Sequence, residues 1–392
     1  MRILVGITGG IAAYKAVEVI RKFTELGHEV RVIATANAKK FIGQTTLEAI
    51  SHNPVESELF HEVSDVRHIE MAQWAELIVI APATAAFLAR TYSGQAEDLL
   101  DNVIVASTAA KVIAPAMHTE MWVNPTTIRN VSGLKDLGFT LIEPEVGRLT
   151  GTDSGVGRLP DAIQIVQGAL NSLKAKDLAN KNVLVIAGGT HEPIDPVRFI
   201  GNRSTGKQGI ALAEEALARG ANVTLIAANF EYVNRHLDLI QVVTAQEVLV
   251  SAQSLISEMD LVVMPAAISD FRVETVAKEK IKKTDVGNDF AIRLIQNPDV
   301  ISTLSASKKL TTKIIGFAAE TISGEGLIAE ATFKLERKGV DMIVANDVSN
   351  GKAFGVDTNE VVLVSKQFEP FMISGSKAEI SAMIYTKALE LV

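Results

Sequence analysis

One structural unit occurs twice in this chain and constrains the fold more than any other feature. It consists of an apolar stretch of strand length, a turn that contains two glycines, and a helix with one apolar face. The first copy begins with Ile3–Ile7 and Thr8-Gly9-Gly10, and the second with Val183–Ala187 and Gly188-Gly189-Thr190. A glycine turn that joins a strand to a helix lets backbone amides approach a phosphate closely. The repeat therefore predicts two α/β domains, each with a ligand site at the carboxyl ends of its strands.

The length and composition agree with two globular domains. The chain has 392 residues, of which 47% are hydrophobic and 21% charged, and one hydrophobic core seldom serves more than about 250–300 residues. The net charge of −8 makes a nucleic-acid partner unexpected. Since there is no cysteine, disulfides, thiolate nucleophiles and cysteine metal sites are excluded. No apolar run reaches about 18 residues and no signal peptide is recognised, so we expect no membrane partner and a cytoplasmic location.

The second copy of the unit also indicates the domain boundaries. Residues 171–182 are polar and rich in lysine, so we expect a linker there, between a domain at 1–170 and a domain at 183–392. Both domains are expected to be α/β with an open, mostly parallel sheet, because most predicted strands are continuous apolar stretches. Alternating apolar residues also predict a hairpin strand over Phe290–Leu294. The other predicted strands are Val30–Ala34, Leu77–Ala81, Lys111–Ala116, Val223–Ala227, Leu261–Met264, Ile314–Phe317, Met342–Ala345 and Val361–Val364.

Three polar motifs follow predicted strands of the first half and strengthen the case for a ligand site there. They are Thr35-Ala-Asn-Ala38, Ala81-Pro-Ala-Thr-Ala85 and Pro115-Ala-Met-His-Thr-Glu-Met-Trp122. The glycine turn alone is equally compatible with a purely structural role, but with these motifs residues 1–165 resemble the flavin-dependent cysteine decarboxylases. The resemblance implies a flavodoxin-like domain that binds FMN. It also implies that FMN is contacted by Gly9, Gly10, Thr35, Asn37, Thr84 and Ser107.

Two histidines are the expected catalytic residues of this half. A lone histidine is more often structural, but His68 matches the catalytic histidine of the decarboxylase family, which implies proton handling while a substrate thiol is oxidised. His118 stands where many members carry an asparagine that orients the substrate carboxylate. Many members also use a flap cysteine as an acid, whereas the segment Gly147–Arg158 has none. Either another acid, with His118 and Asp153 as candidates, supplies the proton, or the second half-reaction is impaired.

The second half carries an acidic residue near a cluster of lysines, just beyond a predicted strand. Asp270 follows Leu261–Met264, and Lys280 lies within Lys278-Glu-Lys-Ile-Lys-Lys283. A carboxylate near ammonium groups suits a nucleoside triphosphate and its divalent cation. For Lys278, Lys282 and Lys283 a solvated surface remains the favoured interpretation.

Upstream lies a second group of residues able to bind anions. Arg198 and Asn202 suit a phosphate or carboxylate, and Ser204-Thr-Gly206 opens a helix whose first amides form another anion-binding cluster. The order of motifs over residues 183–347 resembles that of the phosphopantothenate–cysteine ligases. The matching motifs are Gly188–Thr190, Arg198 with Gly201–Lys207, Ala266–Asp270, Lys280–Lys283, Asn297–Asp299, Gly316–Glu320 and Ala345–Asp347.

The ligase resemblance implies a role for each of these residues. Asp270 binds Mg²⁺ or the ribose–triphosphate region of CTP, Lys280 stabilises charge as an acyl-cytidylate forms, and Asn202 helps cysteine to consume that intermediate. Gly189 and Arg198 bind substrate. The implied nucleotide pocket consists of Met264, Pro265, Ala266, Pro298, Asp299, Val300, Ile301, Phe317, Lys334 and Lys338. Without the resemblance, a solvated helix face would be the default for the last two.

Both halves on one chain resemble the bifunctional coenzyme A biosynthesis enzymes of bacteria. Such an enzyme joins 4′-phosphopantothenate to cysteine with CTP, releasing pyrophosphate and CMP, and then decarboxylates the product with FMN to 4′-phosphopantetheine. The family forms trimers through the first domain and dimers through the second, which implies a homododecamer. Two alternatives stay open. One is an active ligase whose flavin domain acts on another cysteine-ended substrate, such as a peptide, and the other is a non-catalytic flavoprotein scaffold that regulates a partner.

Overall fold

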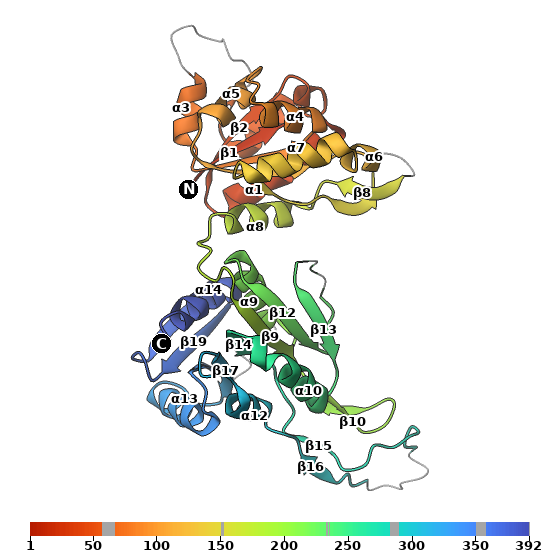
Figure 1. The fold of residues 1–392 in the computed structure, drawn as a ribbon, viewed down its shortest axis with the longest axis vertical. Coiled ribbons are helices and arrows are strands. Elements are labelled where there is room, and N and C mark those ends of the chain that lie inside the picture. Colours follow the sequence, from red (N-terminus) through yellow and green to blue (C-terminus); the bar gives the residue numbers. More distant parts are fainter. Residues whose placement is uncertain are drawn as a thin grey trace. The chain divides into compact units, whose positions relative to one another are not determined.

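The computed structural model describes residues 1–56, 67–149, 153–232, 234, 236–282, 290–349 and 358–391. The chain divides into two compact units, Met1–Lys174 and Ala175–Val392 (Figure 1). Each unit builds its own hydrophobic core around a central sheet, so each is described by itself.

The first unit is a three-layer sandwich around a parallel sheet of order β3-β2-β1-β4-β5-β6. One face is covered by α1, α2 and α8, and the other by α3, α4, α5 and α7. Burial on both faces explains the continuous apolar strands. The strands are β1 (Arg2–Ile7), β2 (Glu29–Ala34), β3 (Val55–Glu56), β4 (Leu77–Ala83), β5 (Ala110–Pro115) and β6 (Thr140–Leu141). The helices are η1 (Ile11–Lys15), α1 (Ala16–Glu25), η2 (Ala38–Lys40), α2 (Gln44–Ser51), α3 (Arg67–Trp74), α4 (Ala85–Ser93), α5 (Leu99–Ala106), α6 (Thr119–Trp122), α7 (Pro125–Asp136) and α8 (Ala162–Asn171).

A small antiparallel hairpin completes the first unit. It pairs β7 (Glu145–Arg148) with β8 (Ser154–Arg158) and contains the described part of the predicted flap. Residues 150–152, at the centre of that segment, lie outside the described residues.

The second unit has an eight-stranded sheet of order β13-β12-β9-β14-β17-β18-β19-β20, antiparallel only from β18 onward. Helices α9 and α14 cover one face, and α10, α12 and α13 cover the other. The strands are β9 (Asn182–Gly188), β12 (Asn222–Ala228), β13 (Asp238–Val242), β14 (Leu261–Met264), β17 (Lys313–Glu320), β18 (Met342–Asp347), β19 (Thr358–Ser365) and β20 (Phe371–Ser376). The helices are α9 (Lys207–Ala218), α10 (Ala245–Leu255), η3 (Ile256–Glu258), α12 (Val300–Ser307), α13 (Glu325–Lys338) and α14 (Lys377–Ala388).

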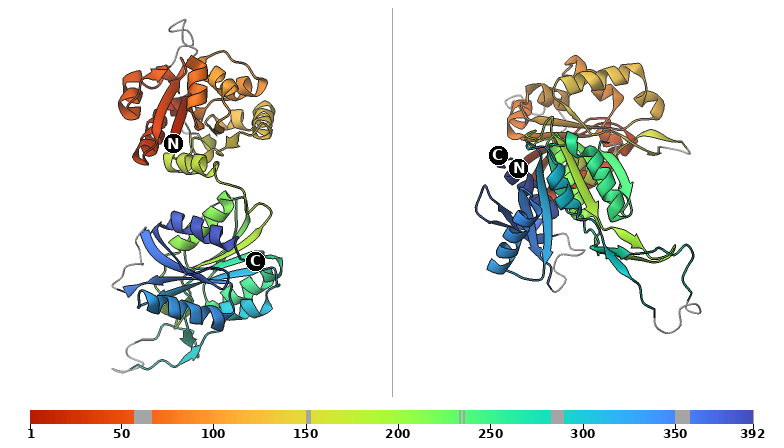
Figure 2. Two further views of the ribbon diagram at one scale, coloured as in Figure 1. Left: turned by 90° about the vertical axis from the view of Figure 1, so that its left-hand side faces the viewer. Right: turned by 60° about the horizontal axis from the view of Figure 1, so that its bottom comes forward.

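Two short hairpins form an arm that projects beyond this sheet (Figure 2). They pair β10 (His191–Pro193) with β11 (Phe199–Gly201), and β15 (Phe271–Val273) with β16 (Leu294–Gln296). The hairpin strand predicted over Phe290–Leu294 is present but displaced, because β16 begins only at Leu294. Phe290 and Ile292 are exposed, so their alternation does not mark a buried strand face.

The structure differs from the predicted organisation in two respects. Both sheets place their first strand beside their fourth, the order of Rossmann-type folds, which is not the strand order of flavodoxin itself. The polar segment 171–182 is also more than a linker. Leu178 is buried in the second core, and Asp177 accepts hydrogen bonds from the buried Arg219 at 2.7 and 2.5 Å. Polar composition concealed this attachment because a single apolar side chain anchors the segment.

Candidate active sites

The first candidate site lies at the carboxyl ends of β1 and β4, where the chain turns toward opposite faces of the sheet. Helix α1 follows β1 on one face and α4 follows β4 on the other, and open α/β sheets commonly bind ligands at such a switch point. The buried Thr8 joins the two turns. Its Oγ1 donates a hydrogen bond to Pro82 O at 2.7 Å and accepts one from Thr84 N at 3.0 Å.

The glycine turn is in close contact with the loop after β2. A Cβ atom on Gly9 would lie 2.3 Å from Asn37 Cβ, so no larger residue fits there without displacing the loop. At Gly10 the nearest atom to such a Cβ would be Thr84 Cγ2, at an ordinary 3.5 Å. Thr35 is buried at the same edge, and its Oγ1 accepts a hydrogen bond from Ala38 N. Five of the six residues expected to contact FMN therefore lie together, on three neighbouring strands.

Ser107 is not part of this group. It follows α5 and precedes β5, so it lies at the amino edge of the parallel sheet, opposite the glycine turn. Its buried hydroxyl donates to Ala72 O at 2.9 Å and accepts from Ala109 N at 3.1 Å. Within its own unit, Ser107 is the C-cap residue of α5 and does not lie beside the other five residues, so its contact with FMN stays a prediction.

His68 lies in the first turn of α3, and its side chain is half-buried. The neighbouring Arg67 pairs with Glu56, the last residue of β3, at 2.6 Å. Since β3 runs parallel to β2 and ends beside it, this ion pair holds the start of α3 at the carboxyl edge. His68 therefore lies on the same side of the sheet as the glycine turn, while residues 57–66 lie outside the described residues.

His118 lies beyond β5 at this same edge, at the N-cap position of α6. Ala116 N donates to Ala83 O at 3.1 Å, which holds the segment beside the end of β4. Strand β8 of the flap packs against the residues on both sides of His118. Met117 N donates to Gly157 O at 3.0 Å, and a Cβ on Gly155 would lie 2.3 Å from Thr119 Oγ1.

The second unit repeats this arrangement at the carboxyl ends of β9 and β14. A Cβ atom on Gly189 would lie 2.8 Å from Asn202 O, so the glycine allows two backbone segments to approach closely. Asn202 Nδ2 donates to Ile268 O at 2.9 Å, and Ser269 N donates to the buried Thr190 Oγ1 at 2.9 Å. The glycine turn, Asn202 and the segment that leads to Asp270 therefore meet.

Lys280 lies on the arm, in a segment tied to Asp195 and Arg198. The carboxylate of Asp195 accepts hydrogen bonds from Val197 N and Arg198 N, both at 2.8 Å, and from Ile281 N at 3.2 Å. Arg198 Nη2 donates to Ile281 O at 2.8 Å. Burial raises the pKa of Asp195, but these backbone hydrogen bonds outweigh burial and lower the pKa below its ordinary value.

Asp270 and Lys280 are both exposed. Among the described residues no hydrogen bond or ion pair joins them. Asp270 instead stands next to Asn297, whose N–H donates to Asp270 O at 2.8 Å. The structure therefore brings Lys280 to Arg198, and Asp270 to the Asn202 segment.

The two lysines of α13 are paired with acidic residues at the carboxyl edge. Lys338 Nζ contacts Asp299, which caps α12, and Lys334 Nζ contacts Glu320 at the end of β17. Burial raises the pKa of Asp299, while hydrogen bonds from Lys338 and Ser302 lower it, and the net result is a pKa below the ordinary value. Both ammonium groups thus point toward the predicted nucleotide pocket and are not on a freely solvated face.

The apolar members of the predicted pocket lie on both faces of the sheet. Met264, Val300 and Ile301 are buried in the core under α10, α12 and α13, with Ala266 packed beside them. Phe317 packs on the opposite face, under α9 and α14. Pro265 is half-buried next to Gly209, and Pro298 is half-buried beside Asp299. Phe317 is therefore separated by the sheet from Met264, Val300 and Ile301. The nucleotide pocket stays a prediction.

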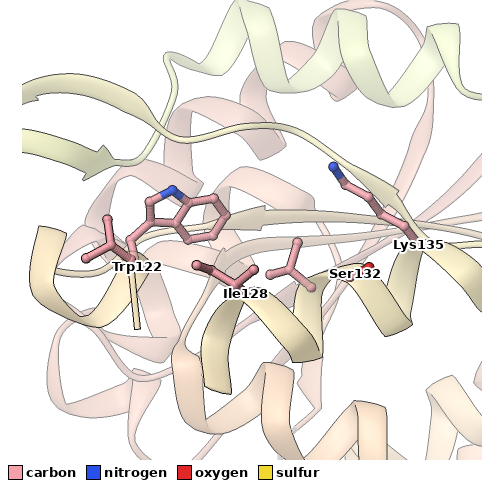
Figure 3. Close-up of a pocket in the computed structure, with 6 residues that line it drawn as sticks. Trp122, Ile128, Ser132 and Lys135 are labelled. Carbon is pink, nitrogen blue, oxygen red and sulfur yellow. The ribbon is translucent and has the colours of Figure 1, made fainter. Parts of the chain in front are cut away.

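A cavity of about 260 Å³ lies elsewhere in the first unit (Figure 3). It is formed by α6, α7 and the turn between them, and contains no residue predicted to bind a ligand. Its lining residues are Trp122, Val123, Ile128, Val131, Ser132 and Lys135. Across the described ranges, no three or more histidine or acidic residues are grouped to hold a metal ion, so any cation near Asp270 would need ligand oxygens as well.

Sequence reasoning missed Thr8, Thr190 and Asp195 as organisers of the sites. Asp195 was detectable, since an aspartate that accepts from the amides two and three residues onward forms a common turn, and Asp195-Pro196 favours such a turn. The two threonines gave no signal, because their hydroxyls bond to residues 74 to 79 positions away.

Comparison with known proteins agrees with this two-part architecture. Residues 1–174 match the flavoprotein family, and residues 178–391 match the C-terminal domain family of DNA/pantothenate metabolism flavoproteins. The chain is 44% identical to the coenzyme A biosynthesis bifunctional protein CoaBC of Mycobacterium bovis, over 98% of this chain and 95% of that protein. It is 41% identical to the protein of the same name from Haemophilus influenzae, over 99% and 97%.

Two solved structures are also similar to parts of the chain. The C-terminal domain of a CoaBC protein is 33% identical and covers 55% of this chain and 97% of that chain, with a TM-score of 0.46. A PPC decarboxylase mutant in complex with pantothenoylaminoethenethiol is 34% identical and covers 42% and 93%, with a TM-score of 0.39.

The fold and the matching families define an α/β protein with a flavoprotein domain followed by a DNA/pantothenate metabolism flavoprotein C-terminal domain. More narrowly, the chain belongs to the family of coenzyme A biosynthesis bifunctional proteins, since it shares 38–44% identity with members over nearly its full length. The predicted α/β class and the predicted family are both confirmed. No described helix is long and apolar enough to cross a membrane.

Proposed function

We propose that the chain makes 4′-phosphopantetheine in two steps, one in each unit. The second unit activates the carboxylate of 4′-phosphopantothenate with CTP and joins it to the amine of cysteine. The first unit then removes the carboxylate of the attached cysteine with FMN. The observation that carries this proposal is the full-length family match combined with two independent strand-edge sites of the same architecture.

The residues at the first edge fit the phosphate end of FMN. Gly9 and Gly10 expose backbone directly before η1, and Asn37 and Thr84 surround that backbone with polar side chains. Bound FMN would accept the hydride, and with it the two electrons, taken from the cysteine side chain. His68, at the same edge, would handle the proton of the substrate thiol, and the resulting thioaldehyde makes loss of the neighbouring carboxylate easier.

In the second unit, Lys280 with Arg198 and Asp270 have different proposed roles. Lys280 and Arg198, whose two segments are joined by hydrogen bonds to Ile281, stabilise negative charge as the carboxylate attacks the α-phosphate and pyrophosphate leaves. Asp270 holds Mg²⁺ together with phosphate oxygens, because a single exposed carboxylate is a typical protein share of such a site. Asn202 orients the acyl-cytidylate for attack by cysteine. Lys334 and Lys338 bind CTP after leaving their acidic partners.

We further propose that the enzyme works in the cytoplasm, where CTP is available, as a homododecamer of trimers and dimers. Exposed apolar side chains on the arm support a dimer contact through the second unit. Val197, Phe199 and Phe271 are 60, 53 and 50% exposed, which is unusual for an arm that faces only water. Native mass spectrometry measures the assembly directly.

The test supplies 4′-phosphopantothenate, CTP, Mg²⁺ and cysteine, and measures CMP and CO₂ separately. We expect Lys280→Ala to remove CMP formation and leave flavin bound, and His68→Ala to block CO₂ release from added phosphopantothenoylcysteine and spare CMP formation. CMP without CO₂ in the unmodified protein would favour a flavin domain that acts on another cysteine-ended substrate. If neither CMP nor CO₂ formed, the remaining interpretation would be a non-catalytic flavoprotein scaffold that regulates a partner.

A further inference from the structure

The decarboxylation has a second half that needs an acid. Loss of CO₂ from the thioaldehyde leaves an enethiolate, whose carbon next to nitrogen must gain a proton. That protonation regenerates a thioaldehyde, which then takes back the hydride and a final proton to give the thiol. The chain has no cysteine, so the first proton comes from another side chain. The question rests on the proposed function of the first unit.

We infer that His118 is this acid. It lies half-buried at the carboxyl edge beside the end of β4, which carries Thr84, and so on the side of the sheet where flavin is expected. A histidine can hold a proton near neutral pH and release it to carbon, whereas a solvated carboxylic acid is almost fully ionised there.

The flap supports this assignment because it packs directly on the His118 segment. Strand β8 contacts both chain neighbours of His118, and two glycines make the contact possible. A Cβ on Gly157, whose φ is +141°, would lie 2.1 Å from Met117 O, and one on Gly155 would lie 2.3 Å from Thr119 Oγ1. Thr119 Oγ1 is buried without a hydrogen-bond partner among the described residues. Larger residues at either glycine would lift β8 away from His118.

The competing acid is less well placed. Asp153 is exposed at the outer end of the hairpin, where its carbonyl accepts a hydrogen bond from Leu149 N at 2.9 Å. No described contact joins Asp153 to the end of β4 or β5. The His118 segment is held in place by the sheet and by β8. A general acid must be held at a fixed position relative to its substrate, and His118 satisfies this requirement.

The experiment follows one turnover without oxygen. Phosphopantothenoylcysteine is mixed with the FMN-loaded protein, and CO₂, the yellow flavin absorbance and 4′-phosphopantetheine are recorded. For His118→Gln we expect CO₂ release within about twofold of the unmodified protein, while the recovery of yellow colour slows at least about 100-fold, in line with loss of a general acid. The bleached flavin and an enethiol product should accumulate. His118→Asn should behave in the same way, since an amide can donate a hydrogen bond but no proton.

Two controls separate the outcomes. His236→Gln changes an exposed histidine of the other unit and should match the unmodified protein. Flavin content and CMP formation by the His118 variants report folding.

Two results would overturn the inference. In one, His118→Gln slows CO₂ release as much as flavin recovery, which would mean that the residue orients the substrate carboxylate. In the other, Asp153→Asn traps the bleached flavin and His118→Gln does not. If the unmodified protein neither bleaches nor releases CO₂, the proposed decarboxylase function itself fails, which is a distinct outcome.

Discussion

The first site requires glycine at position 9, because there is no room for a Cβ atom there. Gly9→Ala would place a carbon 2.3 Å from Asn37 Cβ, and either the glycine turn or the loop after β2 must move. We expect a loss of about 1–3 kcal/mol in unfolding free energy and protein purified with little flavin. Gly10→Ala is the matched control, because its Cβ meets only Thr84 Cγ2 at 3.5 Å and its φ is an extended −151°.

Urea unfolding and flavin absorbance measure both effects. Gly10→Ala should change the unfolding free energy by less than about 0.5 kcal/mol. Equal destabilisation by the two substitutions would show that the close approach of the two loops has no special cost.

Asp195 gives a prediction about pH. Its pKa is lower in the folded protein than in the unfolded chain, so its contribution to stability is present above the unfolded pKa of about 4 and is lost as pH falls through the folded pKa. The unfolding free energy of the unmodified second unit should therefore fall more steeply below about pH 4 than that of Asp195→Asn. Chemical denaturation at a series of pH values tests this, and parallel curves would contradict it.

At the scale of elements, α13 presents one face to the expected nucleotide and another to solvent. Lys334→Ala and Lys338→Ala each remove an ammonium group that lies at the carboxyl edge. A charged hydrogen bond contributes about 1.5–3 kcal/mol, so we expect the KM for CTP to rise about tenfold or more. Flavin binding should not change.

The same helix offers the control for this prediction. Arg337 lies next to Lys338 in sequence but is exposed, with its guanidinium over the Phe333 ring. Arg337→Ala should leave the KM for CTP within about twofold. A similar rise for all three variants would indicate a general electrostatic attraction and no specific contact.

The sequence predicted most elements because local patterns determine them. The strands β1, β2, β4, β5, β9, β12, β14, β17 and β18 are apolar stretches buried on both faces. The hairpin strand after Asp270 begins later than predicted, because Phe290 and Ile292 alternate without being buried. The resemblance did not predict that Ser107 lies at the opposite sheet edge from the glycine turn within its own unit, because the sheet edge at which a residue lies depends on the direction of the preceding helix.

For the whole molecule, the segment between the two units decides how the second unit can be isolated. Leu178 is 2% exposed, and the Arg219 side chain, 7% exposed, is paired with Asp177. A fragment that begins at residue 183 removes the carboxylate that pairs with Arg219, whose guanidinium keeps only its hydrogen bonds to Ala382 O and Thr386 Oγ1, and it also loses the burial of one leucine. We expect that fragment to unfold at much lower urea concentration than one that begins at residue 175.

Asp177→Asn in the longer fragment separates the two contributions, since it keeps Leu178. It should lose part of the stability but less than the shorter fragment does. If both fragments unfolded at the same urea concentration, residues 175–182 would not contribute to the stability of the second unit.

The described core residues of 1–174 form clusters within that unit alone, and those of the second unit do the same, so we expect each half to fold without the other. Lineages could therefore divide such a gene in two, or exchange one half for a distant homologue, without rebuilding either interior. Selection for keeping both activities on one polypeptide would then act on equal dosage and co-assembly, not on folding.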